Sequence, residues 1–201
     1  ELASELRESR SDLEILLYDR GPRILRNFPE KLSKYISKWF SKHDVTVVPN
    51  SVIDRVDPGK IYNNGQPEDI DLVVWTAGIQ PVEVVRNLPI DLSNTGRVIL
   101  NQYHQVPTYK NVYVVGDCAD LPHAPSAQLA ELQGDQIADV LKKQWNNESL
   151  PDKMPEIKIQ GFLGSLGDKQ GFAYIMDRTV TGRLASILKS GVLWLYKYHN
   201  G

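Results

Sequence analysis

Two patterns of apolar and polar residues alternate along the first fifty positions. Residues 14–18 form a short apolar run closed by an Asp-Arg-Gly-Pro turn, a pattern typical of a buried parallel strand. After Pro29, apolar residues recur every three or four positions, as on one face of an amphipathic helix. A second apolar run follows at 45–48. Strand, helix and strand in this order predict a parallel α/β sheet.

The residues before the first strand have the pattern of a helix that is already under way. Leu2, Leu6 and Leu13 are separated by charged residues, and no capping side chain precedes them. Natural chains rarely begin inside such a helix. We therefore expect the chain to be the carboxyl-terminal part of a longer protein, and to be inactive by itself.

The pattern changes between residues 51 and 71. Alternating residues at 52–56 lead into an Asp-Pro-Gly turn, and an Asn-Asn-Gly turn follows at 63–65. Short strands between such turns predict an antiparallel meander. The apolar run at 72–75 then predicts a buried strand, which ends in a turn of small residues, Thr76, Ala77 and Gly78.

Two further strands are predicted at 96–100 and 111–115. The second ends in Gly116 and Asp117, and a long helix is predicted at 126–145. In that helix Ser126 has the residue type and position of an N-cap.

A polar, proline-containing stretch at 146–155 is the best candidate for a linker. Beyond it, strands are predicted at 157–159 and 171–176, and an amphipathic helix at 181–201. These patterns divide the chain into three parts: residues 1–95, residues 96–145 and residues 146–201.

Composition narrows the class of protein. Of 201 residues, 41% are hydrophobic and 24% are charged, which excludes disorder and coiled coil as the main class. The net charge of -2 argues against a nucleic-acid binder. One cysteine excludes a disulfide framework, and Cys118 is better explained as a small buried residue than as a reactive thiol. We assign no metal, because the histidines are scattered without ligand spacing: His43, His104, His123 and His199.

Three places along the chain could carry chemistry. Asp19 ends a strand at the position where an acidic residue of a dinucleotide-binding unit accepts hydrogen bonds from the ribose. A carboxylate there repels a 2′-phosphate, so it favours NAD over NADP. This requires a glycine turn before Glu1; otherwise Asp19 only caps the next loop. The turn at 76–78 would let a ligand approach the backbone closely, although a plain turn would look the same. The third place, Gly116-Asp117 before a long helix, gives the strongest indication of a ligand site.

Taken in order, these motifs resemble type II NADH:quinone oxidoreductases, flavoproteins of the pyridine nucleotide-disulphide oxidoreductase superfamily. Residues 111–119 resemble the second flavin fingerprint, an apolar strand that ends in Gly-Asp. Trp-Thr-Ala-Gly-Ile at 75–79 resembles the family's Trp-Ala-Ala-Gly-Val turn. Ala-Gln-Leu-Ala-Glu-Leu-Gln-Gly at 127–134 resembles its Ala-Gln-x-Ala-x-Gln-Gln-Gly helix start. The match runs through essentially the whole chain.

The resemblance implies an α/β fold, with a Rossmann-like parallel sheet, an antiparallel meander and a small α+β carboxyl-terminal region. It implies FAD and NAD as cofactors. By the same resemblance, residues 1–95 would be a partial NAD-binding unit, residues 96–145 the carboxyl-terminal part of an FAD-binding unit, and residues 146–201 a membrane- or quinone-facing region. Asp117, after Gly116, would hold the ribityl arm of FAD, and Asp19 the NAD ribose. Glu1 would lie near the nicotinamide, the alternative being a solvated helix residue. The turn of Thr76, Ala77 and Gly78 would approach a cofactor.

The resemblance also assigns the start of the long helix. Ala127 and Gln128 would bind the cofactor, with Gln128 where flavin and quinone meet, and the helix would aim its positive end at the flavin. An ordinary capped core helix explains the same apolar residues. Leu132 departs from the family, which has a glutamine there. If that side chain lines the quinone tunnel, the acceptor is in doubt.

The sequence of the last helix is compatible with two roles. It combines basic residues with Trp194 and Tyr196, and no acidic residue follows Asp177. Such a helix suits an anionic membrane surface, or it packs on a neighbouring domain or second subunit. The resemblance favours the membrane.

We thus expect a flavoprotein that passes hydride from NADH to FAD and electrons to a quinone. It would contact the membrane through residues 181–200, from the cytoplasmic side, or be cytoplasmic, with a homodimer possible and no nucleic acid bound. The alternatives are a soluble FAD-dependent reductase with another acceptor, and a non-catalytic binding module.

Overall fold

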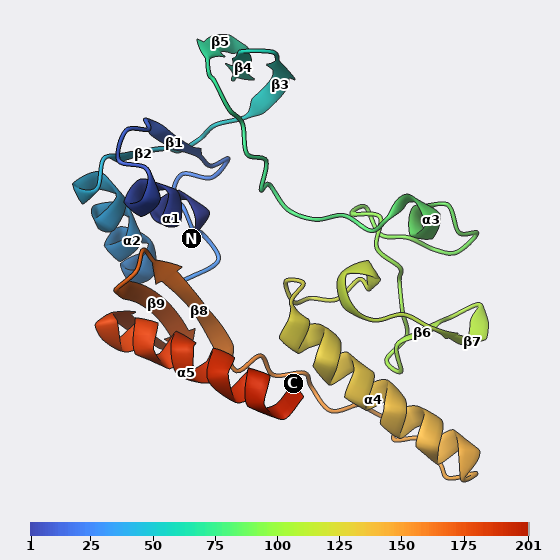
Figure 1. Ribbon diagram of the computed structural model, residues 1–201. Helices are drawn as coiled ribbons and strands as arrows, with labels where there is room; N and C mark the ends of the chain where they lie inside the picture. The colour runs from blue at the N-terminus through green and yellow to red at the C-terminus, as the bar shows by residue number, and fades with distance from the viewer. Residues whose placement is uncertain (201) are drawn as a thin grey trace. The chain divides into compact units, whose positions relative to one another are not determined.

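A computed structural model describes residues 1–200, apart from the side chains of Tyr196, His199 and Asn200. The chain forms two compact units (Figure 1): the first combines Glu1–Val74 with the segment from Gln160 onward, and the second is Trp75–Ile159. The boundaries expected after residues 95 and 145 divide the chain by the cofactor that each part would bind, not by its contacts. They therefore stay a prediction.

The first unit begins with the predicted strand–helix–strand. Helix α1 (Leu2–Ser9) precedes β1 (Ile15–Tyr18), α2 (Glu30–Lys42) and β2 (Val45–Val48). Strands β1 and β2 pair in parallel, with Ile15 opposite Val45. The parallel pair confirms the expected sheet. Helix α1 ends before Leu13, which belongs to the following turn.

Helix α2 supplies most of the core of this unit. Leu32, Ile36 and Phe40 recur at four-residue spacing, so they lie along one face of the helix. Their side chains are at most 3% exposed. The buried core of the unit consists of Ile24, Leu32, Ile36, Trp39, Phe40, Val45 and Leu166.

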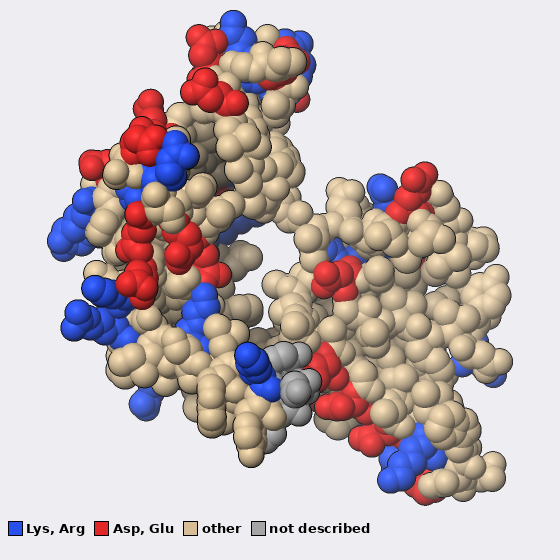
Figure 2. Space-filling view, in the orientation of Figure 1, with Lys and Arg blue, Asp and Glu red and all other residues tan. Residues whose placement is uncertain are grey.

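The predicted meander is present as an antiparallel sheet of β3 (Ile53–Asp57), β4 (Lys60–Asn63) and β5 (Gln66–Asp69). Both connecting turns use a glycine in the left-handed region, as their Asp-Pro-Gly and Asn-Asn-Gly sequences predict. Figure 2 shows acidic and basic side chains gathered around this small sheet, at the top of the view. The Tyr18 hydroxyl ties it to β1 by donating to the Glu68 carboxylate at 2.5 Å.

The carboxyl-terminal part of the chain returns to the first unit. Strands β8 (Gly161–Leu166), β9 (Gln170–Ile175) and β10 (Arg178–Gly182) form an antiparallel sheet, and α5 (Arg183–Asn200) follows directly. Leu166 belongs to the core that α2 builds. Two segments far apart in sequence therefore share one hydrophobic core.

The sequence anticipated β9 but not β8 or β10, and the strand expected at 157–159 is absent. Strand β8 was not predicted because its sequence is rich in glycine, which is a weak strand former. The structure explains two of these glycines. A Cβ on Gly164 would lie 2.2 Å from the ring of Phe172, and one on Gly171 would lie 3.0 Å from the amide nitrogen of Ser186 in α5. These two glycines allow β8, β9 and α5 to pack closely.

The second unit contains α3 (Glu83–Arg86), β6 (Gln105–Val106), β7 (Tyr109–Tyr113), the 3₁₀ turn η1 (Gly116–Cys118) and α4 (Ala127–Trp145). Strands β6 and β7 form an antiparallel hairpin. Helix α4 follows the predicted range and begins after Ser126, as expected.

Two strands predicted in this part of the chain are wrong. Residues 96–100 form isolated bridges at Val98 and no strand. Residues 72–75 are not a strand either, and Leu72 is 78% exposed rather than buried. None of the sheets formed by the described residues includes this segment, so it lacks the neighbouring strands that would cover a buried one.

The strand expected at 111–115 is shifted. The structure places β7 two residues earlier, at Tyr109–Tyr113, and Val112 and Val115 are exposed instead of buried. The expected order of strand, Gly-Asp and long helix is nevertheless correct.

Candidate cofactor site

The candidate site is built around η1, the turn that links β7 to the loop before α4. Gly116 opens the turn with φ +66, in the left-handed region that favours glycine. A Cβ at this position would lie 3.4 Å from the Cβ of Ala130 in α4. Glycine therefore serves both the backbone conformation and the approach of the turn to the helix.

Three hydrogen bonds hold the main chain of η1. The Gly116 N–H donates to Oε1 of Gln133 at 2.8 Å. The Nε of Arg97 donates to the Asp117 carbonyl at 3.0 Å. The Val98 N–H donates to the Cys118 carbonyl at 2.8 Å. Each residue of the turn is thus fixed through its backbone.

The side chain of Asp117 is exposed, so a ligand can reach its carboxylate. The contacts that fix this residue use its carbonyl, which leaves the carboxylate to act on a ligand. An exposed carboxylate on a fixed turn suits a polyol ligand, because two hydroxyls can donate to its oxygens.

Helix α4 begins close to this turn in sequence and contacts it through Ala130. The Ser126 hydroxyl accepts from the Leu129 N–H at 3.2 Å, which confirms the predicted N-cap. The first turn of the helix contains no acidic residue that would neutralise its positive end. Ala127 is exposed, and Gln128 and Leu132, one helical turn apart, are both half-buried.

Arg97 brings a second predicted segment to η1. Its Nη2 donates to the Ile79 carbonyl at 3.3 Å, directly after the turn of Thr76, Ala77 and Gly78. That turn is tight, with the Gly78 N–H donating to the Thr76 carbonyl at 2.9 Å. All three residues are exposed. Two motifs about forty residues apart therefore meet through one guanidinium, and no local pattern in the sequence marked it.

Gln133 is the other residue whose role sequence reasoning missed. Its side chain is fully buried, and beyond the bond from Gly116 its Nε2 is buried without a partner among the described residues. An exposed carboxylate, a left-handed glycine and a positive helix end are the groups that would accommodate the polyol and phosphate arm of FAD. The residues present fit the cofactor that the sequence implied.

Asp19 lies in the first unit at the end of β1, where it was expected. Its Oδ1 accepts from the Gly21 N–H at 2.7 Å, and its backbone bonds to Val48 and Ser51 on the β2 side. One carboxylate oxygen therefore caps the loop, which is the alternative that the sequence left open. Its role toward a ribose stays a prediction.

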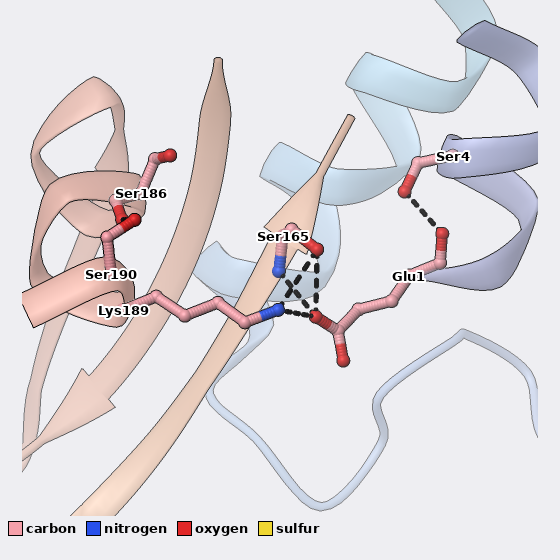
Figure 3. A network of polar contacts seen from close by, with 6 residues as sticks. All are labelled: Glu1, Ser4, Ser165, Ser186, Lys189 and Ser190. Carbon is pink, nitrogen blue, oxygen red and sulfur yellow. Dashed lines mark hydrogen bonds and ion pairs between the residues drawn. The ribbon is translucent and has the colours of Figure 1, made fainter. Parts of the chain in front are cut away.

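Glu1 is exposed at the start of α1, but its carboxylate has defined partners. Figure 3 shows its carboxylate pointing toward Ser165 of β8 and Lys189 of α5, and it accepts from the amide and hydroxyl of Ser165 at 2.8 and 2.9 Å. It also forms an ion pair with Lys189. Burial acts to raise the pKa of Glu1, but the hydrogen bonds from Lys189 and Ser165 outweigh it and lower this pKa to about 2.

This network links α1 to β8 and α5, all in the first unit. The structure thus gives Glu1 a structural contact, and its expected place near a nicotinamide is a prediction.

Among the described residues, no group of three or more His, Cys, Asp or Glu side chains is arranged to hold a metal ion. His104 is buried, and its Nε2 lies 2.8 Å from Oε1 of Gln136. Cys118 is half-buried within η1. Of the helices within residues 1–200, none is long and apolar enough to cross a bilayer.

The parallel pair, the meander and the Gly-Asp turn before α4 define a Rossmann-like α/β protein. A family model described as pyridine nucleotide-disulphide oxidoreductase matches residues 1–134. The chain therefore belongs to the pyridine nucleotide-disulphide oxidoreductase family. The family resemblance drawn from the sequence is confirmed.

Individual relatives make the likeness more specific. The chain is 55% identical over 201 residues to the NADH dehydrogenase-like protein YutJ of Bacillus subtilis, covering 100% of this chain and 57% of that protein. It is 25% identical to a type II NADH:quinone oxidoreductase of Staphylococcus epidermidis, covering 94% of this chain and 49% of that protein.

Among solved structures, the sulfide:quinone oxidoreductase of Aquifex aeolicus matches with a TM-score of 0.77 at 18% identity, over 98% of this chain and 52% of that one. This last likeness shows the fold alone. The chain spans about half the length of the relatives it matches.

Proposed function

We propose that the full-length protein passes hydride from NADH to FAD and electrons on to a quinone at a membrane surface. The observation that carries this proposal is η1, a fixed turn that presents the exposed Asp117 carboxylate ahead of the α4 N-terminus. Membership of the family supports FAD and NADH, and the printed names of the relatives support NADH as donor and quinone as acceptor.

FAD, when bound, would supply the redox chemistry by accepting hydride from the nicotinamide and releasing electrons singly or in pairs. The chain's own residues would bind and orient it. Asp117 would accept hydrogen bonds from the ribityl hydroxyls, and the α4 N-terminus would stabilise negative charge on the pyrimidine side of the flavin. Asp19, with one oxygen on Gly21, would offer the other to the NAD ribose.

Helix α5 supports a membrane-facing role. Ala185 is fully buried against the sheet, whereas the opposite face of the helix exposes apolar residues such as Ile187, at 67%. Figure 2 shows a largely uncharged surface over α5. Near its end, the rings of Trp194 and Tyr198 stack with centroids 5.7 Å apart. An apolar, aromatic face flanked by lysine and arginine suits the interface of an anionic bilayer. The protein would attach peripherally, on the cytoplasmic side.

A second candidate is a soluble FAD-dependent reductase with a different acceptor. Leu132 favours it, because this half-buried leucine stands one helical turn after Gln128, where the resembled family has a glutamine. Without that amide the acceptor pocket would bind a quinone more weakly.

The test is an assay of the full-length protein with NADH and either a short-chain quinone or a soluble dye, with and without anionic lipid vesicles. The proposal predicts quinone reduction that vesicles enhance. Dye reduction without quinone reduction would favour the soluble reductase. A flavin that NADH fails to bleach would contradict both and favour a non-catalytic binding module.

A further inference from the structure

We propose that Gln133 is a positioning residue, which holds the Gly116–Asp117 main chain in the conformation that the flavin arm requires. The inference rests on the proposed function, since it assumes that this turn receives FAD. It concerns a residue of α4 that does not itself need to touch the cofactor.

The first argument is the place of the contact. Gly116 is the first residue of the 3₁₀ turn, and the preceding Val115 provides no side-chain cap. The Gly116 N–H would be left without an acceptor at the start of the turn. Oε1 of Gln133 accepts this N–H at 2.8 Å, across 17 residues of sequence. Gln133 thus caps a turn to which it does not belong.

The second argument is the burial of the amide. Gln133 is 0% exposed, like Leu32 or Val98 in the apolar core. A residue present only for packing would be apolar, because burying an amide is unfavourable unless its groups are bonded. Only one end of this amide is bonded, since Nε2 has no partner in the part of the chain that the structure describes. The bond to Gly116 is therefore the contact that explains a glutamine here.

The third argument is what the contact controls. Gly116 has φ +66, a backbone conformation that residues other than glycine rarely adopt. At the far end, the turn is fixed by the bond of the Val98 N–H to the Cys118 carbonyl at 2.8 Å. Releasing the first end would let the Asp117 carboxylate move relative to α4. Gln133 therefore sets the direction of the carboxylate without contacting it.

Two substitutions in the full-length protein separate this role from packing. Gln133→Met preserves size and removes the acceptor, and Gln133→Glu preserves an acceptor oxygen. Val140→Ala is the matched control, because Val140 is 1% exposed on the same helix, two turns further on. Flavin fluorescence would give the FAD dissociation constant, and hydrogen exchange would report the protection of the Gly116 amide.

We expect Gln133→Met to weaken FAD binding about tenfold, the effect of losing one positioning hydrogen bond, and to speed exchange at Gly116. Gln133→Glu keeps the acceptor oxygen but buries a carboxyl group, so it should speed exchange at Gly116 less than Gln133→Met does. Val140→Ala should lower the melting temperature and leave both readouts unchanged.

Unchanged FAD affinity and unchanged Gly116 exchange in Gln133→Met would overturn the inference. So would a loss of affinity in Val140→Ala equal to that in Gln133→Met. If the wild-type protein binds no FAD, the proposed function fails, while exchange at Gly116 still decides whether Gln133 holds the turn.

Discussion

The Nε of Arg97 donates a hydrogen bond of 3.0 Å to the main-chain carbonyl of Asp117. Its Nη2 reaches the Ile79 carbonyl at 3.3 Å, so one planar group joins two loops. A guanidinium can do this because its donors are held in a rigid fork, whereas a lysine offers a single ammonium. The positive charge alone would not produce the same geometry.

Arg97→Lys should therefore weaken FAD binding by the full-length protein about as much as Arg97→Met, by roughly threefold to tenfold for exposed hydrogen bonds. Flavin fluorescence titration measures the effect. Arg86→Met is the control, because Arg86 is an exposed arginine of the same unit. Wild-type affinity in Arg97→Lys would show that charge, and not the double contact, matters.

The ion pair of Glu1 with Lys189 predicts a dependence of stability on acid. The pKa of Glu1 is lowered to about 2 from its ordinary value of 4.5. A depressed carboxyl pKa stabilises the folded state above pH about 4.5, and this contribution disappears as the pH falls toward 2. Because the pair is partly exposed, its contribution should stay below about 1 kcal/mol.

Hydrogen exchange of α5 amides, compared between variants at the same pH, tests this dependence. Glu1→Gln should exchange faster than the wild type at pH 6, and the difference should vanish near pH 2. Glu5→Gln, an exposed residue on the same helix, should match the wild type at both. A difference that persists at pH 2 would mean that the carboxylate charge is not its cause.

The membrane assignment depends on the outer face of α5. Ile187→Glu should weaken cosedimentation with anionic vesicles about tenfold, because it removes apolar burial and adds a charge of the same sign as the lipid. Val84→Glu is the control: Val84, in α3, is 69% exposed, close to the 67% of Ile187. Equal vesicle binding by the two variants would exclude this face as the contact.

Much of the fold could be predicted because local patterns matched their tertiary setting. The meander turns and the Ser126 cap depend on residues close together in sequence. The β1–β2 pair joins residues 30 apart, but each of its strands and the helix between them has its own local pattern, and that order predicts a parallel pair. The prediction for residues 72–75 was wrong, because an apolar run forms a buried strand only where neighbouring strands cover it.

The candidate site was predicted in part for a similar reason. Asp117 could be found from its own strand and turn, since the signal is local. Gln133 and Arg97 could not, because their contacts with η1 span 17 and 20 residues and depend on how α4 and Val98 meet the turn. Gln133 lies in the motif at 127–134, but neither that motif nor the sequence around Arg97 indicates a contact with the turn.

The most direct test of the account is the FAD affinity of the full-length protein with Asp117→Ala, measured beside Asp120→Ala. Asp120 is an exposed carboxylate three residues further along the same loop, so it controls for the loss of charge. If Asp117 holds the ribityl arm, its loss should weaken FAD binding about tenfold to a hundredfold, while Asp120→Ala keeps the wild-type affinity. Unchanged FAD binding in Asp117→Ala would contradict the account.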